Sequence, residues 1–117
     1  MHSYLNDKKL RKKERLLKRS DFQTVFETRQ STGNKLIVLH ICKNDLGHPR
    51  LGLVVSKKFG NAVARNKFKR RIREFFRLNK SKIGSVDLVV LPSKRPESRA
   101  ANFEQLQTAF MKMLERF

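Results

Sequence analysis

Residues 65–77 read RNKFKRRIREFFR, and this stretch decides how the chain folds. Seven of its thirteen residues are lysine or arginine. Its apolar residues recur at helical spacing, and they are Phe68, Ile72, Phe75 and Phe76. A charge run that cannot pack is usually a solvated tail. Because this run carries its own apolar stripe, we expect a packed helix over residues 62–79 that holds its cations at fixed positions.

A helical wheel separates the core face of this helix from its cations. At about 100° per residue, the core-facing residues fall within an arc of roughly 120°. They are Ala64, Phe68, Ile72, Phe75, Phe76 and Asn79. Arg65 and Lys69 lie at the edge of this arc, and one flank continues from them with Asn66, Arg70, Arg73 and Arg77. Lys67 and Arg71 lie on the other side. Glu74 is the only acid, so ion pairs within the helix cannot neutralise its charge. We therefore expect this helix to contact nucleic acid.

The chain as a whole is strongly basic. It has 28 Lys+Arg against 10 Asp+Glu, a formal charge of +18 over 117 residues, and a pI of about 11.1. Such a charge favours an anionic partner. Hydrophobic residues make up 38% of the sequence and nine are Phe, whereas a disordered basic protein would have few aromatics. The composition indicates one folded, basic domain.

We divide the chain into a basic N-terminal arm, residues 1–19, and a single RNA-binding α/β domain, residues 20–117. The leucines of the arm are too few to bury alone, so it is either mobile or orders on a phosphate backbone. Ser20 and Gln23 have the spacing of a capping box, which predicts a short helix. Apolar runs predict strands over residues 36–42, 51–56 and 86–91. Asn102 is predicted to cap a last amphipathic helix.

The order of these elements predicts the fold. Turn residues 44–49 separate the first two strands, so we expect an antiparallel hairpin. Residues 93–101 are predicted to be a polar, basic loop. The order α-β-β-α-β-α, without a repeat or a linker, predicts an α+β fold, a single two-layer α/β sandwich. If the strands around the basic helix are parallel, pattern alone predicts a right-handed crossover.

The sequence shows no protein catalytic centre. Cys42 makes no ligand spacing with a histidine, and we expect it to be a buried thiol in a reducing cytosol. Asp45, Glu74 and Asp87 are scattered and make no paired-carboxylate site. No signal peptide and no apolar run of membrane-spanning length is found, so we expect a cytoplasmic protein without a membrane partner.

Residues 51–74 carry a resemblance to a known family. They read LGLVVSKKFGNAVARNKFKRRIRE, which is similar almost throughout to the signature of the protein subunit of bacterial ribonuclease P. The resemblance extends over nearly the whole chain through Arg15-Leu16, Asp21-Phe22, Phe26 and Asp87-Leu88-Val89-Val90.

The resemblance implies a function that composition alone does not give. The chain would be the non-catalytic protein subunit of a ribonucleoprotein endonuclease that removes the 5′ leader from precursor tRNA. The protein would bind ribonuclease P RNA and the single-stranded leader, raise substrate affinity, and support catalysis by Mg²⁺ held mainly by the RNA. The resemblance also implies a left-handed β-α-β crossover around the basic helix. No DNA partner is expected.

The resemblance assigns two groups of residues. Those facing the catalytic RNA would be Arg65, Asn66, Lys67, Lys69, Arg70 and Arg73. Those of the leader-binding cleft would be Phe22, Phe26, Ser56, Lys57, Lys58, Asn61 and Lys94. Such a set suits unpaired RNA, whose bases stack on aromatic faces while cations follow the backbone.

The sequence leaves several alternatives open. Phe22 and Phe26 could equally be core residues, because a Phe pair at i,i+4 often is. Lys67 stands where many family members have Arg, which keeps the charge but loses bidentate phosphate geometry. Leu39 stands where a cleft aromatic sometimes sits. Two other classes, structural ribosomal proteins and DNA-compacting proteins, share the charge and size of this chain.

Overall fold

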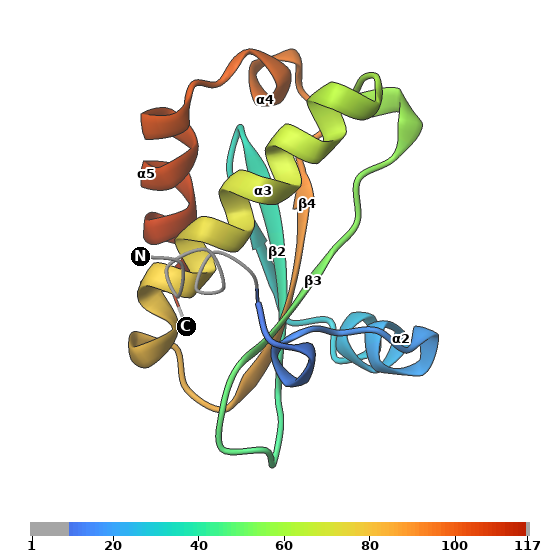
Figure 1. The fold of residues 1–117 in the computed structure, drawn as a ribbon, viewed down its shortest axis with the longest axis vertical. Helices are drawn as coiled ribbons and strands as arrows, with labels where there is room; N and C mark the ends of the chain where they lie inside the picture. Colours follow the sequence, from blue (N-terminus) through green and yellow to red (C-terminus); the bar gives the residue numbers. More distant parts are fainter. Residues whose placement is uncertain (1–9, 117) are drawn as a thin grey trace.

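The computed structural model describes residues 10–116, and these residues fold around a four-stranded sheet in the order β1-β2-β4-β3 (Figure 1). The strands are β1 (Ser31–Gly33), β2 (Ile37–Lys43), β3 (Arg50–Leu53) and β4 (Val86–Pro92). β2 is antiparallel to β1 and β4, whereas β3 and β4 are parallel. The predicted α+β fold class is confirmed.

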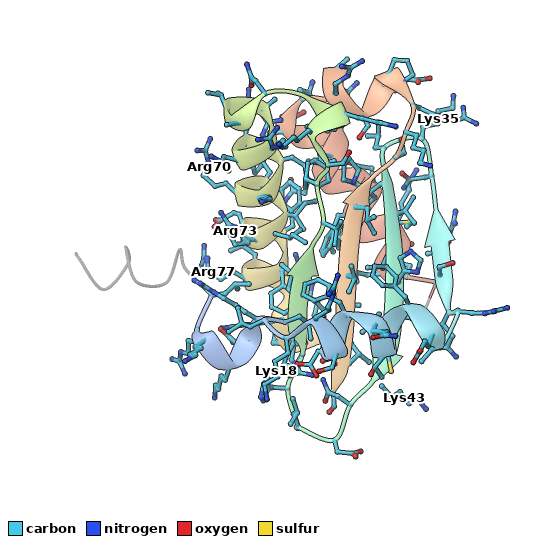
Figure 2. All side chains as sticks on the ribbon, turned by 90° about the vertical axis from the view of Figure 1, so that its right-hand side faces the viewer. Lys18, Lys35, Lys43, Arg70, Arg73 and Arg77 are labelled. Carbon is cyan, nitrogen blue, oxygen red and sulfur yellow. The ribbon has the colours of Figure 1, made fainter. Side chains whose placement is uncertain are left out.

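Helices cover both faces of the sheet. The longer ones are α2 (Arg19–Glu27), α3 (Ala62–Asn79) and α5 (Phe103–Leu114). The short ones are η1 (Lys12–Glu14), η2 (Lys57–Phe59), η3 (Lys80–Lys82) and α4 (Pro96–Ala100). α3 and α5 enclose the larger core on one face, while α2 lies on the other face (Figures 1 and 2).

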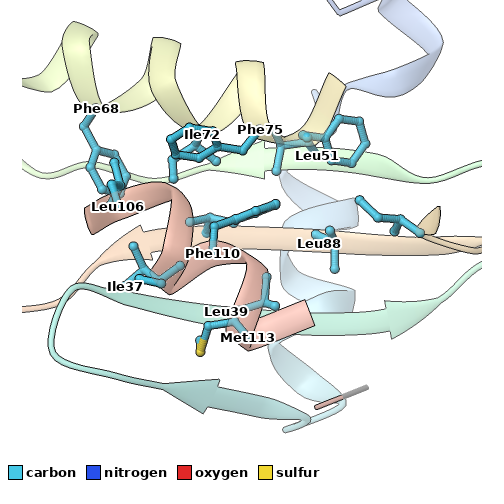
Figure 3. Packing of buried hydrophobic residues seen from close by; sticks show 14 of the residues in the cluster. Ile37, Leu39, Leu51, Phe68, Ile72, Phe75, Leu88, Leu106, Phe110 and Met113 are labelled. Atoms are coloured by element: carbon cyan, nitrogen blue, oxygen red, sulfur yellow. The ribbon is translucent and has the colours of Figure 1, made fainter. Parts of the chain in front are cut away.

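The basic helix forms over the residues that the sequence predicted. The Asn61 side chain begins α3 by accepting a hydrogen bond from the Ala64 amide at 2.9 Å. Five residues of the predicted core face are buried, namely Phe68, Ile72, Phe75, Phe76 and Asn79. Figure 3 shows α3 residues packed with Leu106 and Phe110 of α5 above the sheet. This packing fixes the rotation of α3 and hence the direction of its cations.

The connection β3-α3-β4 is a left-handed crossover. The two strands are parallel neighbours, and α3 joins them along the chain. Seen from the face that α3 covers, with both strands pointing upward, β4 lies to the left of β3 (Figures 1 and 2). This hand is the one that the family resemblance implied, and it is the opposite of the common right-handed rule.

The predicted hairpin between the first two strands is wrong. β4 lies between β2 and β3 and pairs with both, with His40 opposite Val89 and Leu51 opposite Leu88. The physical reason is the composition of β4, since Leu88, Val89 and Val90 are all buried and suit a central strand covered on both faces. The sequence also missed β1 and α4.

The predicted capping box at the start of α2 is also wrong. α2 begins at Arg19, two residues earlier than a Ser20 cap would place it, and Lys18 precedes it without a side-chain cap. Ser20 therefore lies inside the helix, where its carbonyl oxygen accepts a hydrogen bond from the Thr24 hydroxyl at 2.9 Å. The exposed first turn of α2 is held instead by the ion pair between Asp21 and Arg50.

The segment of residues 10–18 packs on the domain. Leu10 and Leu16 are buried against the domain, so this part of the predicted arm packs on the protein itself, which neither of the two expectations for the arm included. The Leu16 amide donates to the Leu51 carbonyl oxygen at 3.0 Å, which extends the sheet beyond β3. Residues 1–9 lie outside the described residues, and the division of the chain at residue 19 stays a prediction.

Candidate nucleic-acid interface

The cationic flank of α3 faces away from the core. Arg70, Arg73 and Arg77 follow one another along the outer side of the helix in Figure 2. Asn66 and Arg70 are exposed, whereas Lys69 and Arg73 are half-buried. The flank begins at the half-buried Arg65, whose Nη1 donates to the Gly60 carbonyl oxygen at 2.8 Å. The structure thus holds these side chains in one row, as the wheel predicted.

Arg73 lies among other cations. It lines a hollow of about 440 Å³ together with Lys69 and with Arg15 of the N-terminal segment. Burial, followed by the charges of Arg15 and Arg70, lowers the pKa of Arg73. Within residues 10–116, no carboxylate forms an ion pair with any of these cations. Their positive charge therefore remains unneutralised in the protein alone.

Arg77 differs from its neighbours on this flank. Its Nη2 and Nε lie 2.8 and 3.2 Å from the two carboxylate oxygens of Glu74. This forked pair is the geometry that a guanidinium prefers with a carboxylate. Glu74 thus neutralises the last cation of the flank and leaves the charge concentrated at Arg70 and Arg73.

A groove runs between α2 and the loops that follow β3 and β4. Its wider part, of about 810 Å³, is lined by Phe22, Phe26 and Val54. Val54 also lines the adjoining part, of about 370 Å³, where Ser56, Lys58 and Lys94 lie. We call these two parts together the cleft. Phe26 is 37% exposed and Phe22 is half-buried, so both rings are accessible from the cleft and not sealed in the core.

Two residues predicted for the cleft do not line it. Lys57 is exposed in η2. Asn61 uses its side chain to cap α3 and lines a separate groove on the far side of η2, next to Lys67. The structure therefore brings Phe22, Phe26, Ser56, Lys58 and Lys94 together, and leaves Lys57 and Asn61 outside.

The β2 side chain beneath α2 is His40, a residue that the sequence missed. Leu39 is fully buried in the core on the opposite face. The His40 ring lies 4.8 Å from the Phe26 ring, edge to face. Its Nδ1 is buried, without a hydrogen-bond partner in the described part of the chain, and burial lowers the pKa of His40. The alternation of side chains along a strand could have signalled that positions 39 and 40 face opposite ways.

An ion-pair network fixes α2 on the sheet. Arg50 donates from Nε and Nη2 to the buried Asp87 carboxylate at 2.8 and 2.7 Å, and its Nη1 lies 3.5 Å from Asp21 at the start of α2. Asn44 donates to the same carboxylate at 2.8 Å. The hydrogen bond to Asp87 raises the pKa of Arg50 against the effect of burial. This network holds one wall of the cleft in place.

The described residues contain no group of three or more His, Cys, Asp or Glu side chains that could hold a metal ion. Cys42 is half-buried, and the Sγ lies 3.4 Å from the Lys43 carbonyl oxygen. No helix over residues 10–116 has the length and apolar character needed to cross a membrane.

The fold and this surface define a class of small, basic α+β proteins with a cationic helix in a left-handed crossover. Comparison with known sequences gives the family. The sequence model of the family Ribonuclease P matches residues 10–117, and the chain belongs to the ribonuclease P protein component family. This membership implies a role in 5′ processing of tRNA, as a subunit of an endoribonuclease complex with ribonuclease P RNA.

The relatives cover most of the chain. A Staphylococcus aureus ribonuclease P protein component is 46% identical over 83 residues, which are 70% of this chain and 71% of its own. One from Alkaliphilus metalliredigens is 35% identical over 103 residues, 87% of this chain and 91% of its own. The solved S. aureus RNase P protein has a TM-score of 0.81 at 38% identity, covering 88% of this chain and 94% of that one. The Thermotoga maritima protein has a TM-score of 0.80 at 39% identity, covering 89% and 97%.

Proposed function

We propose that this chain binds ribonuclease P RNA through the cationic flank of α3 and the 5′ leader of precursor tRNA in the cleft. The observation that carries the proposal is the row of α3 cations from Arg65 to Arg73, which no carboxylate of the described residues neutralises. The protein contributes binding, and the RNA carries out hydrolysis. The cleft would raise the affinity of the complex for substrates that still carry a leader.

The flank suits an RNA backbone. Arg65, Lys69 and Arg73 recur every four residues, about 6 Å apart along the helix axis. Asn66 and Arg70 add a donor and a cation beside them, and Lys67 lies on the other flank. Phosphates that meet these side chains would release counterions, and they would relieve the repulsion between Arg70, Arg73 and Arg15. A rigid row of this kind supports contact with several successive phosphates.

The cleft suits a single strand. The exposed faces of Phe22 and Phe26 would stack unpaired bases, since every base has a face that can stack. Lys58 and Lys94 would follow the backbone at the other end, beside the Ser56 hydroxyl. Lys57 and Asn61 would act only at its margin, because neither lines the cleft.

The Mg²⁺ ions that the reaction needs would be bound mainly by the RNA. Mg²⁺ is usually bound by phosphate oxygens and water together with at most one or two carboxylates, so the phosphates of the RNA would supply most of its ligands. The chain would instead support the ions indirectly, by lowering the charge repulsion between the leader and the catalytic RNA. We also propose that the protein acts in the cytoplasm, where precursor tRNA is made.

A cleavage assay tests the proposal. Catalytic RNA and precursor tRNA are combined at low Mg²⁺, with and without the full chain. We expect the chain to stimulate cleavage, and Arg70→Gln to lower the slope of log affinity for the RNA against log salt by roughly one. Phe22→Ala should weaken binding of leader-bearing substrate by about 1–3 kcal/mol. Lys112→Gln, an exposed cation of α5, serves as the control.

Three results would contradict the proposal or its assignment of Phe22. Unchanged cleavage, together with co-sedimentation of the chain with ribosomal particles, would favour a structural ribosomal protein. Equal binding of duplex DNA and precursor tRNA would favour a DNA-compacting protein. An equal loss of leader-bearing and leader-free substrate in Phe22→Ala would assign Phe22 to the core.

A further inference from the structure

A second groove lies between α3, α4 and α5, on the side of η2 away from the cleft. It has a volume of about 440 Å³, within the range of small-ligand sites. In Figure 1, α4 lies beside the beginning of α3, and the chain continues from it into α5. The residues that matter for its chemistry are Phe59, Val63, Lys67, Arg71 and Arg99. We call it the α3–α5 groove.

The groove is positively charged. Lys67 and Arg99 are exposed at its rim, and none of the residues that line it is acidic. Arg71 donates from Nη1 to the Ala101 carbonyl oxygen at 3.3 Å, which leaves most of its N–H groups available. Over residues 10–116, no ion pair involves these three cations. Charge complementarity therefore points to an anionic occupant.

The groove also exposes apolar surface that the fold does not use. Val63, in the first turn of α3, is 74% exposed. Phe59 stands beside it, with the ring packed against buried Phe68 at 5.4 Å between centroids. Beside the groove, the Arg71 guanidinium lies 5.9 Å above the ring of Phe103, a residue of α5 that is 40% exposed and does not itself line the groove. Exposed apolar surface surrounded by cations is the pattern of a base-stacking platform.

The walls of the groove are anchored. Ser98 is buried in α4, and its hydroxyl donates to the Leu36 carbonyl oxygen at 2.7 Å, which ties α4 to the segment before β2. On the α5 side, the groove is lined by Leu106, which is buried in the core. Because both walls are held by the core, the groove exists before any partner arrives and binding would cost little ordering.

We propose that the α3–α5 groove binds one unpaired nucleotide of RNA. The base would lie on Phe59 and Val63, and its phosphates would meet Lys67, Arg71 and Arg99. The inference rests on the proposed function, because it takes the partner to be RNA. Two sources share this chemistry. The first source is the leader, which could continue from the cleft into the groove, because Phe59 and Arg99 line both. The second source is the catalytic RNA, an unpaired nucleotide of which could enter beside Lys67.

The test introduces a negative charge into the groove without touching the core. Val63→Glu is compared with Leu78→Glu, since Leu78 is an apolar residue of the same helix, 53% exposed and about four turns away. Affinity is measured for catalytic RNA alone, and for the assembled complex with precursor tRNA and with the same tRNA lacking its leader. We expect Val63→Glu to weaken one of these affinities roughly tenfold more than Leu78→Glu does. Thermal melting of both variants confirms that each is folded.

The pattern of losses identifies the source of the nucleotide. A loss with catalytic RNA alone assigns the groove to that RNA, whereas a loss only with leader-bearing tRNA assigns it to the leader. Arg99→Gln should lower the salt slope of the same interaction by about one, and Lys112→Gln should not. Equal effects of Val63→Glu and Leu78→Glu on every RNA would overturn the proposal. If Arg70→Gln and Phe22→Ala act as expected in that case, the proposed function stands and only the groove proposal fails.

Discussion

The ring of Phe26 on α2 stands edge-on against the imidazole of His40 on β2, with 4.8 Å between centroids and 80° between planes. This contact ties an accessible ring of the cleft to a central region of the sheet. It also explains how Phe26 can stay 37% exposed and still keep a defined position. The geometry of the cleft therefore depends on the half-buried side chain of His40.

Acid should destabilise the protein through His40. Burial lowers the pKa of His40, so the unfolded chain binds this proton more readily than the folded protein does. The free energy of unfolding should therefore fall as the pH drops below the ordinary histidine value of 6.5 and through the lowered pKa. Denaturant titrations from pH 8 to pH 5 measure this slope. His40→Gln should flatten it and His48→Gln should not; an equal slope in His40→Gln would show that another group is responsible.

Gly52→Ala should displace Phe22. A Cβ built on Gly52 would lie 2.5 and 2.8 Å from Cε1 and Cζ of the Phe22 ring and 3.0 Å from Leu16, too close for the ring to stay in place. Overpacking of this kind costs about 1–3 kcal/mol of stability. We expect a selective loss of affinity for leader-bearing precursor over leader-free tRNA, measured with the assembled complex. Gly84→Ala is the matched control, because nothing lies within 4 Å of its Cβ position. Equal losses for both substrates would mean that Phe22 does not contact the leader.

The sequence predicted α3 better than any other part of the fold. The apolar spacing from Phe68 to Phe76 and the Asn61 cap are local signals, and they fix the limits and the rotation of the helix without help from elsewhere. The sheet order depends instead on pairing between distant segments, which periodicity along the chain does not reveal. β4 could enter between β2 and β3 only because Leu88, Val89 and Val90 are apolar towards both faces.

The candidate site shows the same difference between local features, which the sequence predicted, and features that join distant segments, which it did not. The row from Arg65 to Arg73 follows from helix geometry, and the structure holds it as expected. The cleft was predicted only in part. Asn61 was assigned to it, but its side chain caps α3 instead. On β2, the side chain that faces α2 is His40 and not Leu39, because neighbouring residues of a strand face opposite sides. The α3–α5 groove escaped prediction, since one of its walls is α4, where the composition of residues 93–101 indicated a loop.

Glu14→Gln should loosen the N-terminal segment. Glu14 is buried, and its carboxylate accepts from Lys80 Nζ at 2.7 Å and from the Arg11 amide at 2.9 Å. Removing the charge should lower the free energy of unfolding by about 1–3 kcal/mol. It should also speed amide exchange at Leu16, whose N–H bonds to Leu51. Glu115→Gln, on the exposed end of α5, should change neither quantity. Unaltered exchange in Glu14→Gln would show that the two leucines hold the segment by themselves.

The same carboxylate predicts a second acid transition. Burial raises the pKa of Glu14, but the hydrogen bonds from Lys80 and Arg11 outweigh it, and the net pKa is lowered. Its contribution to stability is therefore complete above the ordinary value of 4.5 and is lost as the pH falls through the lowered pKa. Denaturant titrations between pH 5 and pH 3 should show a steeper fall for the wild-type chain than for Glu14→Gln. Parallel curves would exclude Glu14 as the titrating group.

Arg73→Gln and Arg77→Gln should differ in the sign of their effect on stability. Burial and the charges of Arg15 and Arg70 disfavour the positive charge of Arg73. The carboxylate of Glu74, in contrast, stabilises the positive charge of Arg77. Without RNA and at low salt, we expect Arg73→Gln to raise the free energy of unfolding by up to about 1 kcal/mol, and added salt to reduce the gain. Arg77→Gln should lower it slightly. RNA binding should show the reverse order, with the larger loss of affinity in Arg73→Gln, because its charge is neutralised only by a partner. A stabilised Arg73→Gln that binds RNA as tightly as the wild-type chain would mean that no phosphate reaches Arg73.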